Sequence, residues 1–190
     1  MPLAAPFRAV RVVLVACLGF GGAAPARATD RAVAAEALPD TNAAVNRASA
    51  HLPDAVTDDW ATPTELRARG AGDCEDFAIA KYFALLAQGL PPSRLRLAYV
   101  RLQLGGGAVW QPHVVLVVLP SDDAPIDTAE VLDSVLDDVR PLARRPDLDV
   151  RMSFNADGLW PGLARGPAAR PPAQLRRWAR VLALAAAGAP

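Results

Sequence analysis

The sequence contains few cysteines and few histidines. Its 190 residues include only Cys17 and Cys74 and only His51 and His113. Two cysteines are too few for a disulfide-rich scaffold, and two histidines leave a short choice of general bases. Chemistry that pairs a thiol with an imidazole must therefore use these side chains.

The sequence also lacks an excess of positive charge, an internal repeat and a long apolar run. Basic and acidic residues are balanced at 20 each, and nothing in their distribution favours a nucleic acid as partner. The apolar run from Val12 to Ala24 is rich in glycine and alanine and is shorter than the roughly 20 residues that a transmembrane helix needs.

The first 28 residues have the pattern of an export signal. Arg8 and Arg11 precede the apolar run, and Ala26-Arg27-Ala28 offers a cleavage site. We therefore predict a signal peptide at 1–28 and a periplasmic or secreted mature chain. Its removal takes three basic and no acidic residues, which leaves a formal charge of −3 (17 − 20).

A lipoprotein signal is the alternative, because Leu14-Val15-Ala16 precedes Cys17 with a suitable small-residue pattern. It is disfavoured because only five residues separate Arg11 from Cys17, whereas an apolar signal core has about 7–15 residues. Cleavage after Ala28 removes Cys17. Cys74 is then unpaired and is either a buried inert residue or a reactive thiol.

The mature chain is long enough for one domain with a core but not for two. We place this domain at 29–161, and an Arg-, Ala- and Pro-rich tail at 162–190. Within the tail, 173–187 is predicted to form an amphipathic helix. We favour packing of this helix on the domain; a loose tail that touches an acidic surface or lipid head groups is the alternative.

Within the domain at 29–161, local signals predict three helices and four strands. The helices are Asp40–Leu52, capped by Asp40 or Thr41; Thr62–Ala68, with Thr62 as N-cap; and a buried central helix, Asp73–Gln88. The strands are Leu95–Leu104, Val114–Leu119, Ala124–Leu132 and Val150–Asn155, with a turn at 105–107 between the first two. A helix packed on an antiparallel sheet makes an α+β fold.

Cys74 lies in Gly72-Asp73-Cys74-Glu75-Asp76, at the start of the central helix. A helix N-terminus favours the thiolate through its dipole and unpaired N–H groups. The flanking carboxylates oppose it, so a histidinium or a cation must offset them. The alternative reading is structural, because a lone cysteine is often a buried apolar residue.

His113 is the better of the two candidate bases for Cys74. It directly precedes the buried strand, where its position is fixed, whereas His51 ends a surface helix. Asp133 follows the next strand and is the candidate to orient the imidazole, with Asp127 as its rival. Cys, His and Asp in this arrangement form the constellation of proteases and acyltransferases.

The acids beside the cysteine allow two interpretations. Asp73, Glu75 and Asp76 suit the positive end of the helix dipole as capping residues, which is the reading that the residues alone favour. They also supply three hard oxygen donors to a calcium site, which needs six to eight oxygens. No EF-hand loop is present.

Five segments resemble the bacterial transglutaminase-like cysteine proteinases, which include the LapG-type periplasmic proteases. The resemblance runs from about Asp58 to Trp160. The Gly-Asp-Cys-Glu-Asp block and its helix carry most of it; the segments are 59–63, 72–81, 113–116, 131–133 and 153–155.

The resemblance implies a papain-like or transglutaminase-like core with Cys74 as nucleophile, His113 as general base and acid, and Asp133 as the residue that orients His113. It also implies an oxyanion donor at the Cys74 N–H, with Trp60 as a weaker second candidate.

LapG-type members depend on calcium through acids beside the cysteine, which makes Asp73, Glu75 and Asp76 candidate Ca²⁺ ligands. Such members cleave large surface adhesins near an N-terminal Ala-Ala site, and a cyclic-di-GMP-responsive inner-membrane receptor sequesters them. The sequence therefore predicts a calcium-dependent cysteine endopeptidase. A transglutaminase, in which an amine resolves the same thioester, and a catalytically silent binding module are the alternatives.

Overall fold

The computed structural model describes residues 28–52 and 59–188, so the predicted signal peptide lies almost wholly outside the described residues. The helices are α1 (Ala28–Ala48), α2 (Pro63–Arg69), α3 (Cys74–Ala87) and α4 (Arg176–Ala186). Short 3-10 turns are η1 (Pro92–Arg94), η2 (Ile126–Thr128), η3 (Leu142–Arg144) and η4 (Pro172–Gln174). The strands are β1 (Ala50–His51), β2 (Ala71–Gly72), β3 (Leu95–Gln103), β4 (Trp110–Val118), β5 (Glu130–Leu132), β6 (Arg140–Pro141), β7 (Leu148–Asn155) and β8 (Gly158–Pro161).

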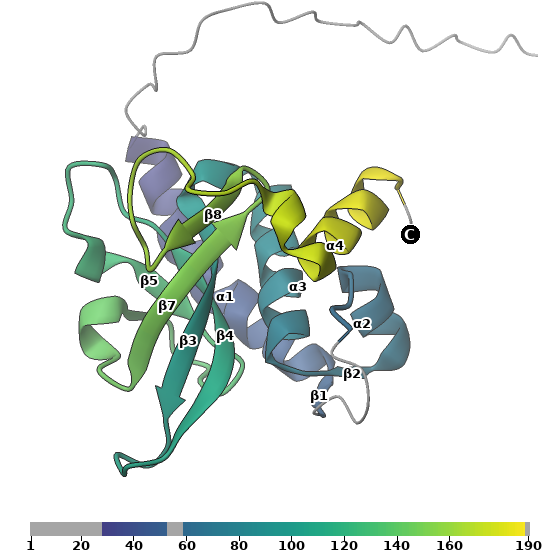
Figure 1. Ribbon diagram of the computed structural model, residues 1–190, viewed down its shortest axis with the longest axis horizontal. Coiled ribbons are helices and arrows are strands. Elements are labelled where there is room, and N and C mark those ends of the chain that lie inside the picture. The colour runs from purple at the N-terminus through teal and green to yellow at the C-terminus, as the bar shows by residue number, and fades with distance from the viewer. Residues whose placement is uncertain (1–27, 53–58, 189–190) are drawn as a thin grey trace, which may run out of the picture.

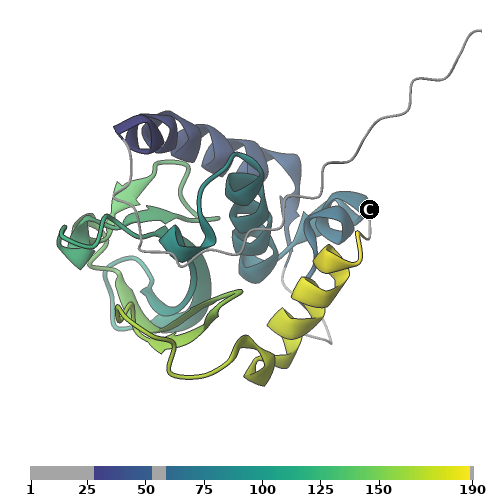
Figure 2. The ribbon, with the colours of Figure 1, turned by 90° about the horizontal axis from the view of Figure 1, so that it is seen from above.

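A six-stranded antiparallel sheet and the helix α3 form the centre of the fold. The strand order is β6-β5-β4-β3-β7-β8. α3 lies beside β4 and is flanked by α1 and α2, and α4 packs on α3 on the side away from α1 (Figures 1 and 2). The predicted α+β class, with the cysteine-bearing helix on an antiparallel sheet, is confirmed.

Alternation along β4 divides its side chains between two apolar clusters. Val114 and Leu116 pack in the cluster that includes α3, whereas Val115 and Val117 pack in a second cluster on the other face of the sheet. All residues from 114 to 119 are buried, as predicted for a strand covered on both faces. His113 stands where this burial begins, because Gln111 and Pro112 before it are exposed.

α2 follows the predicted capping pattern closely. The Thr62 side chain accepts from the Glu65 N–H and the Glu65 carboxylate accepts from the Thr62 N–H, which makes a capping box with Pro63 at the first helical position. Gly70 ends the helix with φ of +66°, a left-handed conformation that favours glycine.

α1 differs from its prediction at both ends. The helix begins at Ala28, passes through Pro39 and ends at Ala48, so the expected cap at Asp40 or Thr41 is wrong. Leu38 and Asn42 are buried, which shows that packing overrides the local break that a proline signals. His51 lies in β1, not at a helix end, and stacks on Phe77.

The predicted strand 124–132 is mostly wrong. Only Glu130–Leu132 pairs with β4, and the preceding residues form the turn η2 after Pro125. Proline fixes φ and lacks an N–H, so it favours a turn over a ladder here.

The helix predicted at 173–187 is present as α4, at 176–186, and it packs on the domain. Trp178 is fully buried, donates its indole N–H to the Asn155 carbonyl oxygen at 2.9 Å, and meets Tyr82 edge to face. Arg180 on the outer side pairs with Glu65 of α2. The segment predicted as a tail therefore supplies part of the core.

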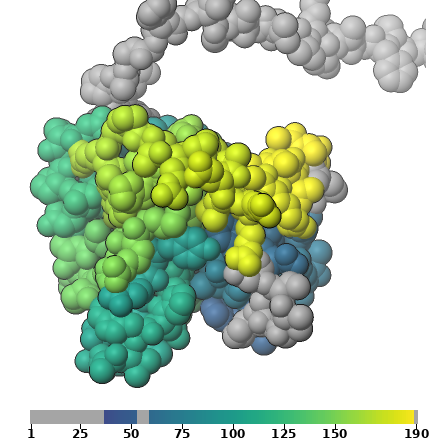
Figure 3. Space-filling view, viewed as in Figure 1, coloured from purple at the N-terminus to yellow at the C-terminus, as the bar shows by residue number. Residues whose placement is uncertain are grey.

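The β3–β4 hairpin extends beyond the rest of the sheet. Its tip projects at the bottom of the space-filling view, in teal (Figure 3). Three apolar side chains there are exposed, Leu104, Val109 and Trp110, and Arg101 lies over the Trp110 ring.

Within the described ranges, no helix combines the length and apolar character needed to cross a membrane.

Candidate active site

Cys74 is the first residue of α3 and is half-buried beside β4. The N–H of Val114, the residue after His113, donates to the Cys74 thiol. β5 pairs with β4 only from Leu116 onward, so the helix N-terminus meets β4 before that pairing begins. The fold therefore places the thiol next to the His113-Val114 peptide.

The thiol is held in its protonated form. Sγ donates a hydrogen bond to Glu75 Oε2 at 2.9 Å. Burial raises the pKa of the Cys74 thiol far above its usual value, and the Glu75 carboxylate raises it further by charge and hydrogen bonding. The helix dipole does not overcome these effects in this arrangement.

His113 and Asp133 form a buried pair. His113 Nε2 lies 2.7 Å from Asp133 Oδ1, and the side chains are 4% and 0% exposed. Leu116 of β4 pairs with Leu132 of β5, so β5 ends beside β4 three residues from His113, and Asp133 follows β5 directly. Because Nε2 faces Asp133, Nδ1 is the ring nitrogen left for the thiol.

Asp133 accepts three hydrogen bonds through its two oxygens. Oδ1 takes the contact with His113 and a longer one from the Val135 N–H at 3.2 Å, and Oδ2 accepts from Arg145 Nη2 at 2.8 Å. Burial alone would raise the pKa of Asp133, but the hydrogen bonds and charges of His113 and Arg145 lower it to about 2.

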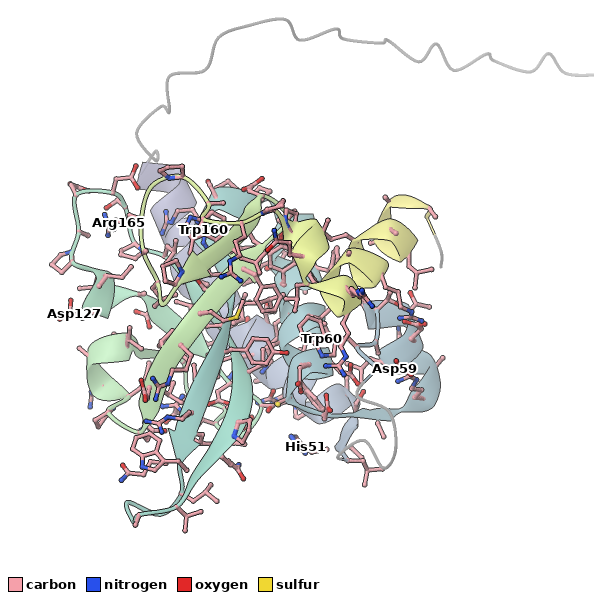
Figure 4. The ribbon with its side chains drawn as sticks, viewed as in Figure 1. His51, Asp59, Trp60, Asp127, Trp160 and Arg165 are labelled. Atoms are coloured by element: carbon pink, nitrogen blue, oxygen red, sulfur yellow. The ribbon has the colours of Figure 1, made fainter. Side chains whose placement is uncertain are left out.

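The rival candidate, Asp127, does not take this place. It lies in η2, is exposed, and points away from the body at the outer edge of the molecule (Figure 4). His51 is also exposed and stacks on Phe77, while His113 occupies the buried pair.

Helix α1 anchors the loop that follows Asp133. Asn46 Nδ2 donates to the Asp133 carbonyl oxygen at 3.0 Å, and Asn42 Nδ2 donates to the carbonyl oxygens of Leu136 and Asp137. Lys81 of α3 is also fully buried nearby, and the charges of Asp133 and Asp137 act on it.

The three acids around Cys74 have different surroundings. Asp73 occupies the N-cap position of α3, yet its side chain makes no cap hydrogen bond, so its predicted capping role is wrong. Asp76 is buried; its Oδ1 accepts from the Ala61 N–H at 2.6 Å, while Oδ2 has no partner. Gly72 is required here, because a Cβ would lie 2.5 Å from that Oδ2.

The oxygen donors of Asp73, Glu75 and Asp76 are of the type that binds a cation such as calcium. In this structure the three side chains do not converge on a single metal position. Burial raises the pKa of Glu75 to about 7, with Asp73 adding to the effect, and burial raises that of Asp76 to about 6. Both shifts reflect the cost of burying a charged carboxylate, which the charge of Arg69 offsets only in part at Asp76. The described part of the chain holds no ready group of three or more His, Cys, Asp or Glu side chains around a metal position.

Trp60 lies between the sheet and the helices. Its indole is 2% exposed and stacks on Phe154 with ring centres 5.5 Å apart, and Figure 4 shows it at the centre of the molecule. Its carbonyl oxygen accepts from Arg180. A contribution of Trp60 to an oxyanion site stays a prediction.

Sequence reasoning missed Arg145, Asn42 and Asn46 around Asp133. Arg145 stands beside Arg144 in a polar turn and looks like a solvated residue, yet it is 3% exposed. The two asparagines are one helical turn apart on α1, a spacing that places them on one face. That spacing is the signal that was available in the sequence.

The helix-borne thiol, the buried His-Asp pair and the antiparallel sheet define the transglutaminase-like class of cysteine proteinases. A family model described as "Bacterial transglutaminase-like cysteine proteinase BTLCP" matches residues 20–146. The chain belongs to this family of cysteine proteinases.

Solved structures give the same assignment. Calcium-bound LapG of Legionella pneumophila is 35% identical, with a TM-score of 0.65, and the alignment covers 77% of each chain. A second structure of that LapG is 33% identical, with a TM-score of 0.66, over 80% of this chain and 77% of that one. An EGTA-treated form is 33% identical, with a TM-score of 0.64, over 77% and 76%. No curated protein matches the chain.

Proposed function

We propose that the protein is an exported cysteine endopeptidase in which Cys74, His113 and Asp133 form the catalytic triad. The observation that carries this proposal is the contact between the Val114 N–H and the Cys74 thiol, directly beside a buried His113–Asp133 pair. A thiol, an imidazole and a carboxylate in this order form the unit that generates and uses a nucleophile.

The proposed role of each residue follows from the atom that it has available for the reaction. Nδ1 of His113 takes the thiol proton, and Sγ attacks the peptide carbonyl carbon. The unpaired N–H of Cys74 at the helix N-terminus faces the developing oxyanion, with Trp60 as a second, weaker candidate donor. His113 then protonates the leaving amine, and a water deprotonated by His113 hydrolyses the thioester.

Calcium dependence is part of the proposal, with Asp73, Glu75 and Asp76 as ligands. It is supported by the raised pKa values of Glu75 and Asp76, the unpartnered Asp76 oxygen, and the calcium-bound structure of the related LapG. A bound calcium ion supplies positive charge that neutralises these acids. If Glu75 held the ion, its negative charge would be neutralised and would raise the pKa of the Cys74 thiol less, so that the thiol proton would pass to His113 more readily.

The proposed substrate is an exported protein, and a large surface adhesin is the leading candidate. This follows from the predicted signal at 1–28 and the similarity to LapG, and the proposed location is the periplasm. A cyclic-di-GMP-responsive inner-membrane receptor is the proposed partner that sequesters the enzyme. Neither role calls for a nucleic acid.

The test is cleavage of adhesin N-terminal fragments by the mature chain, with calcium and with chelator. We expect cleavage in calcium only, and a loss of at least about 10³-fold in Cys74→Ala and His113→Ala. Arg101→Gln is the matched control, because it removes an exposed ion pair with Asp149.

Two outcomes would contradict the proposal. Equal cleavage by Cys74→Ala would remove the thiol from the reaction. Incorporation of a labelled primary amine into the fragments, without cleavage, would identify a transglutaminase instead, because an amine and not water would then resolve the thioester.

A further inference from the structure

Arg145 and Asp147 form a partly buried ion pair that the catalytic steps above do not use. Arg145 donates through Nε and Nη2 to the Asp147 carboxylate, at 2.8 to 3.2 Å. The same Nη2 also reaches Asp133 Oδ2 at 2.8 Å. The Arg145 side chain is 2% exposed and that of Asp133 0%, whereas Asp147 is 33% exposed.

The backbone around this pair is fixed on both sides. Arg145 directly follows the turn η3, and its N–H donates to the Leu142 carbonyl oxygen. The Leu148 N–H donates to the Arg145 carbonyl oxygen, and the Gln103 N–H on β3 donates to that of Asp147. Arg145 therefore lies in the short connection between η3 and β7.

This geometry leaves the Asp133 carboxylate little freedom to rotate. With only Oδ1 held, the carboxylate could swing about its Cβ–Cγ bond and still contact His113. Arg145 holds Oδ2 and so fixes the carboxylate plane, and Asp147 in turn fixes the planar fork of Arg145. The series His113, Asp133, Arg145 and Asp147 connects the site to the surface.

We propose that Arg145, held by Asp147, is a positioning residue that fixes the Asp133 carboxylate and through it the His113 ring. The proposal rests on the catalytic role proposed for Asp133. Arg145 touches neither the substrate nor the reacting atoms, so it acts on the rate of the chemical step and not on substrate binding.

The exposed pair of Arg101 and Asp149 is a close control for this proposal. Arg101 also donates through Nε and Nη2 to a carboxylate near the same end of β7, at 3.0 and 2.6 Å. Its side chain is 48% exposed, and in the described structure its hydrogen bonds do not involve Asp133. The same substitution at the two arginines therefore separates positioning from the general loss of a surface charge.

The kinetic test compares Arg145→Gln, Arg145→Lys and Arg101→Gln on the cleaved fragment. We expect kcat to fall about 10- to 100-fold in Arg145→Gln with KM unchanged, because small displacements of a catalytic group have effects of this size. Arg145→Lys keeps one donor and the charge, so it recovers part of the rate. Arg101→Gln retains the wild-type kcat.

A spectroscopic test requires no substrate and does not depend on the protease assignment. His51 is exposed, so its ring N–H exchanges rapidly with water, and the buried His113 Nε2–H gives the single protected imidazole proton signal. We expect this signal to shift or broaden in Arg145→Gln and to stay unchanged in Arg101→Gln. The signal is assigned by its loss in His113→Ala.

The outcomes separate the two proposals. A folded Arg145→Gln with wild-type kcat and an unchanged signal overturns the positioning role. Absence of any Cys74-dependent activity in the wild type overturns the triad, and the proton signal still decides whether Arg145 orders the pair. If Arg145→Gln does not fold, Asp147→Asn decides: a loss of about 3- to 10-fold in kcat with a shifted signal supports the role, and no change in either overturns it.

Discussion

The His113 side and the Cys74 side of the proposed site differ in the charges that surround them. Asp133 is fully buried, yet His113 and Arg145 lower its pKa to about 2. Around Cys74 there are three acids, and the pKa of the thiol is raised by burial and by Glu75. His113 and Arg145 therefore stabilise the ionised Asp133, whereas burial and a neighbouring acid oppose ionisation of both the Cys74 thiol and Glu75.

This difference indicates that activity is controlled at Cys74 and Glu75 and not at His113. An arrangement in which His113 and Asp133 are already paired needs no further partner to hold the base. A thiol that donates to Glu75 is a poor nucleophile, because the thiolate is the reactive form. We therefore expect conditions that change the charge around Glu75 to govern activity.

The largest effect is expected from Asp133→Asn, which removes the carboxylate charge between His113 and Arg145. The amide cannot carry the charge that His113 and Arg145 require, so kcat should fall by about 10⁴-fold. Arg145 keeps its ion pair with Asp147 and loses only the charged partner Asp133, so the free energy of unfolding should fall by about 1–3 kcal/mol. Cleavage kinetics and urea unfolding measure both effects; retention of more than a tenth of the wild-type kcat would contradict the assignment.

Glu75→Gln removes an acid beside Cys74. It should speed thiol labelling in chelator but slow substrate cleavage in calcium. In chelator, the loss of the carboxylate charge lowers the pKa of the Cys74 thiol, so iodoacetamide should label it faster, by about tenfold for each unit of pKa. In calcium, cleavage should fall because a proposed ligand is gone. Asp138→Asn, at an exposed acid outside the site, is the control. Slower labelling of Glu75→Gln in chelator would contradict this view.

The smallest effect on catalysis is expected at Lys81, the single lysine of the sequence, which should instead give stability a pH dependence. Burial lowers its pKa from 10.5 to about 7, although the charges of Asp133 and Asp137 oppose this. Between these pH values the unfolded chain holds a proton that the folded chain has released, so stability rises with pH.

Lys81→Met should remove this rise, which we put at ~3 kcal/mol between pH 7 and 10. Urea unfolding of both proteins across this range is the measurement. Arg101→Gln serves as a control for the loss of an exposed charge. Parallel pH curves for wild type and Lys81→Met would show that Lys81 keeps its ordinary pKa in the folded protein.

Elements with strong local signals could be predicted from the sequence. α2 was recognised from Thr62 and Pro63, α3 from the apolar helix between Asp73 and Gly89, and β3 and β4 from alternation around the glycine turn. The contact between His113 and Asp133 follows from the order of the strands that carry them. The catalytic roles of these residues stay predictions.

Features that depend on distant partners could not be predicted. β1 and β2 have two residues each and exist through their pairing with each other. α1 continues through Pro39 because its buried side chains pack in the fold, and Arg145 is buried in contact with Asp133 and Asp147. No local pattern in the sequence records such contacts.

The central claim is that Cys74 is a nucleophile. His113 can activate it only when Glu75 no longer raises the pKa of the thiol. The most direct measurement is the rate of iodoacetamide labelling of native Cys74 at pH 6, with calcium and with chelator, in the wild type and in His113→Ala. The account predicts fast labelling in calcium, slow labelling in chelator, and slow labelling of His113→Ala in both. Equal rates in all four samples would contradict it and would make Cys74 a structural residue.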